Sequence, residues 1–140
     1  MNTTITHSDD SINRAFIPFK PQSSDETIVA GIIRKMLHYH ILRVQLEGAR
    51  PWMHDQQRVF ARQQAIEARR RGFAEEREAI DSGIHVSYDD ELLRQEATRI
   101  AYLLSGDKVE EAMSLEEEII MISVNHCLYG TALEAMRIAA

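Results

Sequence analysis

The sequence has few of the residues on which covalent, metal or membrane chemistry depends, and each shortage excludes a class of protein. Cys127 is the only cysteine, so an intramolecular disulfide is impossible and a reducing compartment is favoured. The glycines are scattered singly, so there is no glycine-rich phosphate loop. The apolar segment at residues 119–124, which includes Ser123, is far short of the ~20 residues that cross a bilayer, and no other apolar run approaches that length. The N-terminus lacks a secretion signal. These absences predict a soluble, cytoplasmic protein without membrane contact.

The histidines do not have the spacing of a metal or catalytic site. His38 and His40 lie two residues apart, which on a helix turns their side chains about 200° away from each other. Neither Glu-x-x-His, His-Glu-x-x-His nor Cys-x-x-Cys occurs. Cys127 lies in the most apolar segment, where a thiol behaves as a small hydrophobe. We therefore expect no catalytic residue, no metal and no cofactor, and predict that the protein is not an enzyme.

The charge is unevenly divided along the chain. Residues 1–71 hold eleven Lys and Arg against seven Asp and Glu, whereas residues 72–140 hold five against fifteen, a net charge of +4 followed by one of −10. The overall charge of −6 argues against general affinity for nucleic acid. A split of this kind suggests a charged partner. An extended set of carboxylates can present a surface like that of a nucleic-acid backbone, although an acidic surface that only confers solubility explains the same composition.

Apolar residues recur at helical spacing, and no strand-like alternation exceeds four residues, so the fold class is all-α. Capping patterns mark three helix starts, at Ser23, Ser87 and Ser114. The segment 119–133 is apolar nearly all round and is predicted to form the centre of the core. We expect a mobile tail over residues 1–22 and one elongated helical domain over 23–140, with four to five helices at about 24–47, 52–82, 88–105, 107–113 and 115–138.

The second predicted helix has an unusual apolar pattern. Its large apolar side chains recur every seventh residue, while the positions three or four further on are mostly Asp, Gln, Arg and Glu. Such a pattern is one row of a heptad and is too narrow to cover a helix that packs into a globular core. This helix is therefore predicted to contact a neighbour only along a narrow line.

The run Arg69 to Arg71 in this helix admits two interpretations. Three consecutive residues on a helix fan over about 200°, so they do not form a stripe along a nucleic-acid groove. Glu67 and Glu75 stand four residues on either side of Arg71, at the spacing of ordinary helical ion pairs. A solvated, self-paired helix face is favoured, and weak nucleic-acid binding through these arginines is the alternative.

Two segments of the chain are similar to a known family. Residues 39–67, "YHILRVQLEGARPWMHDQQRVFARQQAIE", and residues 105–136, "SGDKVEEAMSLEEEIIMISVNHCLYGTALEAM", resemble Gam, the host-nuclease inhibitors of lambdoid phages. The most specific parts are Tyr39 to Gly48, Trp52 with the pair Gln56 and Gln57, and the acidic start of the last helix. Residues before about 30 show no such likeness, and the arginine run departs from what a DNA mimic requires.

The resemblance implies an all-α homodimer that mimics DNA and occupies the DNA channel of the RecBCD helicase–nuclease, with the first helix projecting into that channel. It implies no direct binding of nucleic acid. The heptad row could then serve both chains of a symmetric dimer. The residues assigned to the dimer interface are Trp52, Val59, Ile66, Phe73 and Ile80. Those assigned to partner binding, by region, are Arg34, Lys35, His38 and Glu47 on the first helix and Glu75, Glu76, Glu78 and Asp81 on the second. The rival hypothesis is a helical assembly or adaptor protein whose acidity only keeps it soluble.

Overall fold

A computed structural model describes residues 18–48 and 54–130, and these residues form four α-helices without a strand. The helices are α2 (Ser24–Gly48), α3 (Asp55–Asp81), α4 (Asp90–Ser105) and α5 (Val109–Tyr129). The all-α fold class is thereby confirmed. In the described part of the chain, no helix is long and apolar enough to span a membrane.

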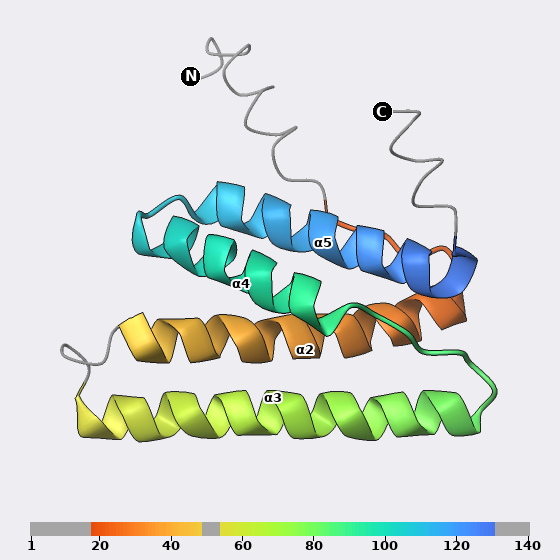
Figure 1. Ribbon diagram of the computed structural model, residues 1–140, viewed down its shortest axis with the longest axis horizontal. Helices are drawn as coiled ribbons and strands as arrows, with labels where there is room; N and C mark the ends of the chain where they lie inside the picture. Colours follow the sequence, from red (N-terminus) through yellow and green to blue (C-terminus); the bar gives the residue numbers. More distant parts are fainter. Residues whose placement is uncertain (1–17, 49–53, 131–140) are drawn as a thin grey trace, which may run out of the picture.

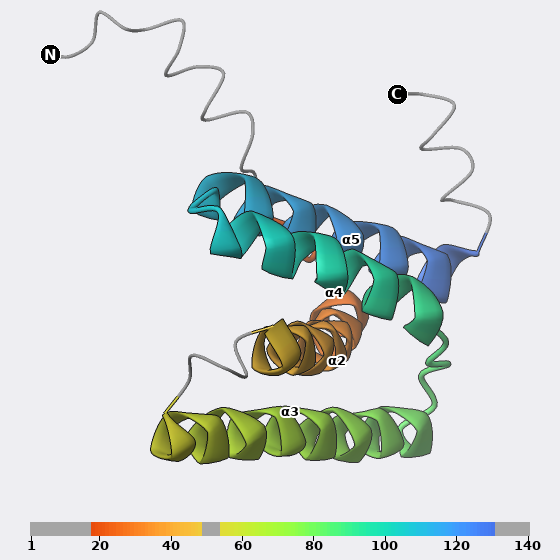
Figure 2. The same ribbon diagram turned by 60° about the vertical axis from the view of Figure 1, so that its left-hand side comes forward.

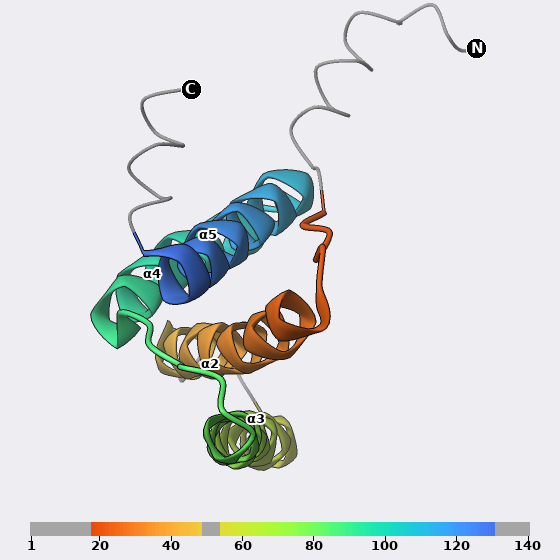
Figure 3. The same cartoon turned by 90° about the vertical axis from the view of Figure 1, so that its right-hand side faces the viewer.

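The helices lie in three layers with α2 in the middle (Figure 1). On one side α3 runs antiparallel to α2, and on the other side α4 and α5 form an antiparallel pair (Figure 2). The view along the helices shows α3 separated from α4 and α5 by α2 (Figure 3). Of the other helices, only α2 packs against α3. The helix α2 is therefore the element that holds the two sides together.

The main core lies between α2 and the pair of α4 and α5. Its largest fully buried side chains are Val29, Ile32, Ile33 and Leu37 of α2, Leu93 and Ile100 of α4, and Ile120 and Val124 of α5. The expectation that residues 119–133 form the centre of the core is wrong in this respect, because α2 contributes half of these side chains. A helix with neighbours on two sides buries more of its circumference than one that covers a single side.

The helix starts follow the predicted capping signals only in part. At α2, the amide of Glu26 donates to Ser23 Oγ at 3.2 Å, and Glu26 Oε1 accepts from the amide of Gln22 at 2.9 Å. At α4, Asp89 rather than Ser87 is the N-cap, and its carboxylate accepts from the amide of Leu92 at 3.1 Å.

The break predicted at Ser114 does not occur. A single helix, α5, replaces the two segments expected at 107–113 and 115–138, and Ser114 lies inside it. The turn comes earlier, at Asp107, whose φ of +60° is in the left-handed region. A Ser with Glu three residues later is also compatible with a helix interior, so the pattern alone does not mark a start. Residues beyond 130 lie outside the described residues.

The tail predicted over residues 1–22 lies outside the described residues as far as residue 17. Residues 18–22 are described, and Phe19 is the residue of this stretch that is not exposed. Phe19 packs against the core, and its amide donates to Glu117 Oε1 of α5 at 2.9 Å. This segment and the start of α2 are thus fastened to α5.

Candidate protein-interaction surface

The side of α3 that faces α2 is made of small residues. Ala65, Ala68, Gly72 and Ala79 are the buried residues of this helix. A Cβ atom at Gly72 would come within 2.7 Å of Met36 Sδ, so a side chain there would need Met36 to move. Small residues on one face bring two helix backbones close together, and they leave the large side chains of α3 on its other faces.

The heptad row of α3 is exposed to solvent. Exposure of its members ranges from 47% for Phe73 to 58% for Ile66, and Phe60 beside the row is 62% exposed. Four of the five residues assigned to a dimer interface, Val59, Ile66, Phe73 and Ile80, lie on this row, while Trp52 falls outside the described residues. No helix of the described chain covers them. We call Val59, Ile66, Phe73 and Ile80 the α3 row.

The charges of α3 change sign along its length. Residues 55–71 contain five arginines and two acidic residues, a net charge of +3. Residues 72–81 contain four acidic residues and one arginine, a net charge of −3. An antiparallel pair of such helices places the positive half of each chain against the negative half of the other, whereas a parallel pair places like charges together.

Of the partner-binding residues assigned on α2, two form ion pairs with other helices and two are exposed. Arg34 Nη1 lies 2.6 Å from Glu117 Oε2, and Lys35 Nζ lies 2.9 Å from Glu75 Oε2. These two cations therefore join α2 to α5 and to α3. His38 and Glu47 are exposed.

The bond between Arg34 and Glu117 affects both pKa values. Burial raises the pKa of Glu117, but the hydrogen bonds from Arg34 and from the amide of Phe19 outweigh burial and leave the pKa below its usual value. The same bond raises the pKa of Arg34. Burial raises the pKa of the neighbouring Glu116.

The four carboxylates at the acidic end of α3 are also of two kinds, those bonded to neighbouring side chains and those left exposed. Glu75 binds Lys35, and Glu76 Oε1 accepts a hydrogen bond from the phenol of Tyr88 at 2.9 Å. Both carboxylates are partly buried and bonded within the described chain, so they are less available to a partner than an exposed carboxylate would be. The side chains of Glu78 and Asp81 are exposed and make no ion pair or hydrogen bond within residues 18–48 and 54–130. They are the carboxylates of this helix that remain available to a partner.

The three arginines of the run also differ. Arg70 and Arg71 both bind Glu67, with nitrogen–oxygen distances of 2.6 and 2.8 Å. Hydrogen bonds from Arg70 and then Arg71 lower the pKa of Glu67 to about 2. The predicted pairing of Arg71 with Glu67 is confirmed, whereas Glu75 binds Lys35 instead of Arg71. Arg69 points to α2.

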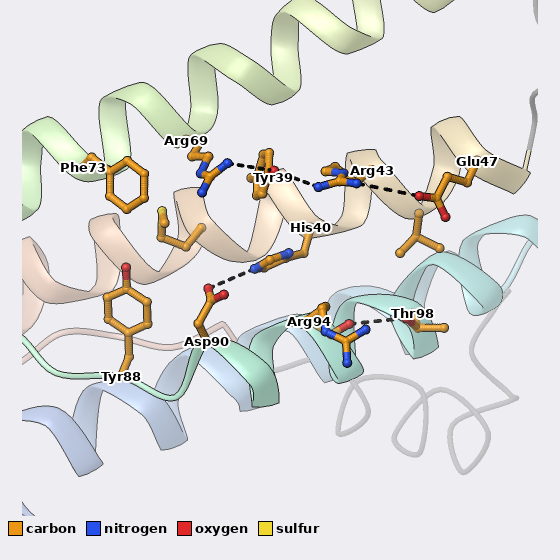
Figure 4. A pocket seen from close by; sticks show the side chains of 12 residues that line it. Tyr39, His40, Arg43, Glu47, Arg69, Phe73, Tyr88, Asp90, Arg94 and Thr98 are labelled. Carbon is orange, nitrogen blue, oxygen red and sulfur yellow. Dashed lines mark hydrogen bonds and ion pairs between the residues drawn. The ribbon is translucent and has the colours of Figure 1, made fainter.

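Arg69 lines a groove of about 660 Å³ that runs over α2 between α3 and α4 (Figure 4). Its Nη1 atom donates to Tyr39 Oη at 3.2 Å, and Arg43 Nη1 donates to the same oxygen at 3.1 Å. On the α4 side, His40 Nε2 lies 2.9 Å from Asp90 Oδ1. The hydrogen bond to Tyr39 raises the pKa of Arg43.

The sequence did not single out Tyr39 and Arg43 as candidate site residues. A signal was present, because Arg43 follows Tyr39 by four residues and therefore lies on the same face of a helix. The third member, Arg69, is brought to them by the packing of α3 on α2, which no local pattern specifies.

The described residues contain no group of three His, Cys, Asp or Glu side chains that could hold a metal ion. Cys127 is buried, its Sγ donates to the carbonyl of His85 at 3.3 Å, and burial raises the pKa of the thiol. A thiol with a raised pKa is a poor nucleophile.

No protein-family model, no characterised protein and no solved structure matches this chain. The resemblance to Gam therefore depends on the two sequence segments quoted above.

Proposed function

We propose that this protein acts by binding other proteins: two copies associate through the α3 row, and the dimer blocks a RecBCD-like nuclease by occupying its DNA channel. The observation that carries the proposal is the division of α3 into a small-residue face against α2 and an uncovered row of large apolar side chains. A helix whose large apolar side chains are all about half exposed or more has the composition of an interface.

A second copy of the chain is the partner that fits this row. The opposite charges of its two halves make α3 self-complementary in an antiparallel arrangement. Centred between Ile66 and Phe73, such a pair sets Ile66 of one copy beside Phe73 of the other, and Val59 beside Ile80. Arg70, which would lie near the centre, is paired with Glu67, a carboxylate that it shares with Arg71.

The contact with the nuclease is assigned to the acidic end of α3. The projecting first helix that the resemblance implies does not suit α2, because this helix has neighbours on two sides and its apolar residues form the core. Glu78 and Asp81, in contrast, are exposed and unpaired within the described chain. In a two-fold dimer these carboxylates occur twice, and they would meet Lys and Arg side chains of a DNA channel.

The direct test is digestion of linear duplex DNA by RecBCD with increasing amounts of the full chain. Inhibition should be relieved by more DNA ends and should weaken as salt rises from about 50 to 300 mM, over which the Debye length contracts from roughly 14 to 6 Å. The protein alone should not retard duplex DNA in a gel, because a mimic does not bind what it imitates.

Charge reversal locates the contact. Glu78→Lys with Asp81→Lys should weaken inhibition at least tenfold without loss of helicity. Glu111→Lys with Glu118→Lys makes the same change in net charge on exposed positions of α5 and serves as the matched control. Equal losses in both variants would indicate a general effect of charge. Undiminished digestion at a large excess of folded protein would reject this target and leave the adaptor function, for which the exposed α3 row is the supporting observation.

A further inference from the structure

Two guanidinium groups donate hydrogen bonds to one neutral oxygen on a part of the surface that has no role in the proposed function. Arg43 and Arg69 both donate to Tyr39 Oη, so their donor nitrogens lie no further apart than two hydrogen bonds allow. Two cations this close repel each other unless an anion stands near them. This cost makes the pair different from an ordinary surface arginine.

Nearby carboxylates compensate for the pair only weakly. The carboxylate nearest to Arg43 is Glu47, with 3.8 Å between Nη2 and Oε1, and the side chain of Glu47 is 77% exposed. Arg69 has no carboxylate within ion-pair distance in the part of the chain that the structure describes. Arg70 and Arg71, which follow it directly, both hold Glu67. Two of the three consecutive arginines thus share one carboxylate of the same helix, and the third is directed into the groove.

Aromatic rings fix the position of both guanidinium groups. Arg69 Cζ lies 5.0 Å from the ring centre of Tyr39 and 5.3 Å from that of Phe73, and Arg43 Cζ lies 5.8 Å from the Tyr39 ring. Tyr39 itself is only 8% exposed and is packed by Ala65 and Ala68. Stacked arginines keep their donors in place, so less conformational freedom is lost when a ligand binds.

We propose that Arg43, Arg69 and the phenol of Tyr39 form a binding site for a phosphate group on the α3 side of the groove that runs over α2 between α3 and α4. Guanidinium groups that reach one point from opposite sides (Figure 4), with a hydroxyl between them, offer donors in several directions. A tetrahedral oxyanion accepts hydrogen bonds in this way, whereas a planar carboxylate is satisfied by one guanidinium fork. The groove is large enough for the phosphate of a small molecule or for a segment of a phosphate backbone.

Thermal unfolding of the full chain tests the site, with pyrophosphate as the probe at constant ionic strength. About 5 mM pyrophosphate should raise the Tm of the wild-type protein by about 4 °C, since a ligand that binds only the folded state stabilises it. The variant with Arg43→Gln and Arg69→Gln should lose this shift. The matched control, Arg70→Gln with Arg71→Gln, removes the same charge from the same part of the molecule and should keep the full shift.

Two further measurements make the result decisive. Arg43→Lys with Arg69→Lys keeps the charge but removes the forks, and it should bind pyrophosphate several-fold more weakly even if the Gln variant does not fold. A 5′-phosphorylated duplex oligonucleotide forms the second arm: retardation that requires Arg43 and Arg69 would identify nucleic-acid phosphate as the source, and would also contradict the DNA-mimic function. The absence of any response to both probes, or an equal response in the Gln variant, overturns the site.

Discussion

The two sides of α2 are packed by different means. Towards α4 and α5, fully buried Ile, Leu and Val side chains interlock. Towards α3, the contact consists of alanines, a glycine and polar links such as the ion pair between Lys35 and Glu75. Large aliphatic side chains remove much apolar area from water and leave a cavity when they are truncated, whereas small residues do neither. The contact of α2 with α4 and α5 therefore supplies most of the stability, whereas the contact of α2 with α3 mainly positions α3.

The same difference explains why the large side chains of α3 face solvent. A helix that docks through alanine and glycine has its bulky residues free for another contact. The α3 row is thus a consequence of how α3 is attached, and the comparison between the two sides of α2 can be tested by substitution.

The largest effect should come from truncation on the aliphatic side. Ile120→Ala removes a side chain that is 0% exposed and should lower the free energy of unfolding by about 3 kcal/mol through lost burial and a new cavity. Ile66→Ala makes the same chemical change at a position that is 58% exposed and should cost less than about 0.5 kcal/mol in the monomer. Urea unfolding at low protein concentration measures both. Equal costs would show that Ile66 on the α3 row is buried as deeply as the aliphatic core, contrary to its exposure.

A smaller loss is expected when the ionic link between α2 and α5 is broken. Glu117→Gln leaves Arg34 without its closest partner and weakens the bond to the amide of Phe19. Because Arg34 remains partly exposed to water, the cost should be about 1 to 2 kcal/mol at pH 7, measured by urea unfolding. The matched control is Glu118→Gln, which removes the same charge from an exposed neighbour and should be nearly neutral.

The pH dependence of that loss follows from the lowered pKa of Glu117. A carboxyl whose pKa is lower in the folded state contributes stability above its ordinary pKa, and this contribution disappears as the pH falls through the folded value. The advantage of the wild-type protein over Glu117→Gln should therefore begin to shrink as the pH falls below the ordinary pKa of a glutamate, and it should disappear only below the lowered pKa of the folded state. A difference between the two proteins that stays constant from pH 7 to pH 3 would contradict the assignment.

Substitution of two glycines tests how closely α2 and α3 approach each other. The expected changes in the free energy of unfolding have opposite signs. A Cβ at Gly31 would meet nothing closer than Glu75 Oε1 at 3.5 Å, so Gly31→Ala should stabilise the protein by about 0.5 to 1 kcal/mol through helix propensity. At Gly72 the buried Met36 stands in the way, so Gly72→Ala should give no gain and a loss of up to about 1 kcal/mol. Equal gains at both positions would show that α3 does not need the close approach.

The sequence predicted the helical class and the α3 row because both depend on local spacing. It did not predict the order of the layers. The nearly all-apolar segment at 119–133 was predicted to be the centre of the core in preference to α2, because the packing of α3 on the more polar side of α2 cannot be inferred from a single segment. The contacts of Lys35 with Glu75, and of Tyr39 with Arg69, join residues 40 and 30 positions apart. Neither pair has a spacing that a helical pattern could reveal.

Charges placed on the α3 row should change the stability of a single chain least of all. They should have a large effect on the association of two chains. Ile66→Asp with Phe73→Asp should leave the helicity of the monomer nearly unchanged, because both side chains are already about half exposed. The same variant should abolish a dimer, since burial of two carboxylates in an apolar contact is costly.

Tyr102→Asp, at a position of α4 that is 79% exposed, is the control and should keep the association state of the wild-type chain. Sedimentation at micromolar concentration distinguishes the cases. A wild-type monomer there would remove the second copy as the partner of the α3 row, and a dimer that survives both Asp substitutions would place the interface elsewhere. If the charge halves of α3 set the antiparallel arrangement, raising salt should weaken the wild-type dimer only modestly, because the apolar row supplies most of the contact and the exposed charges are screened.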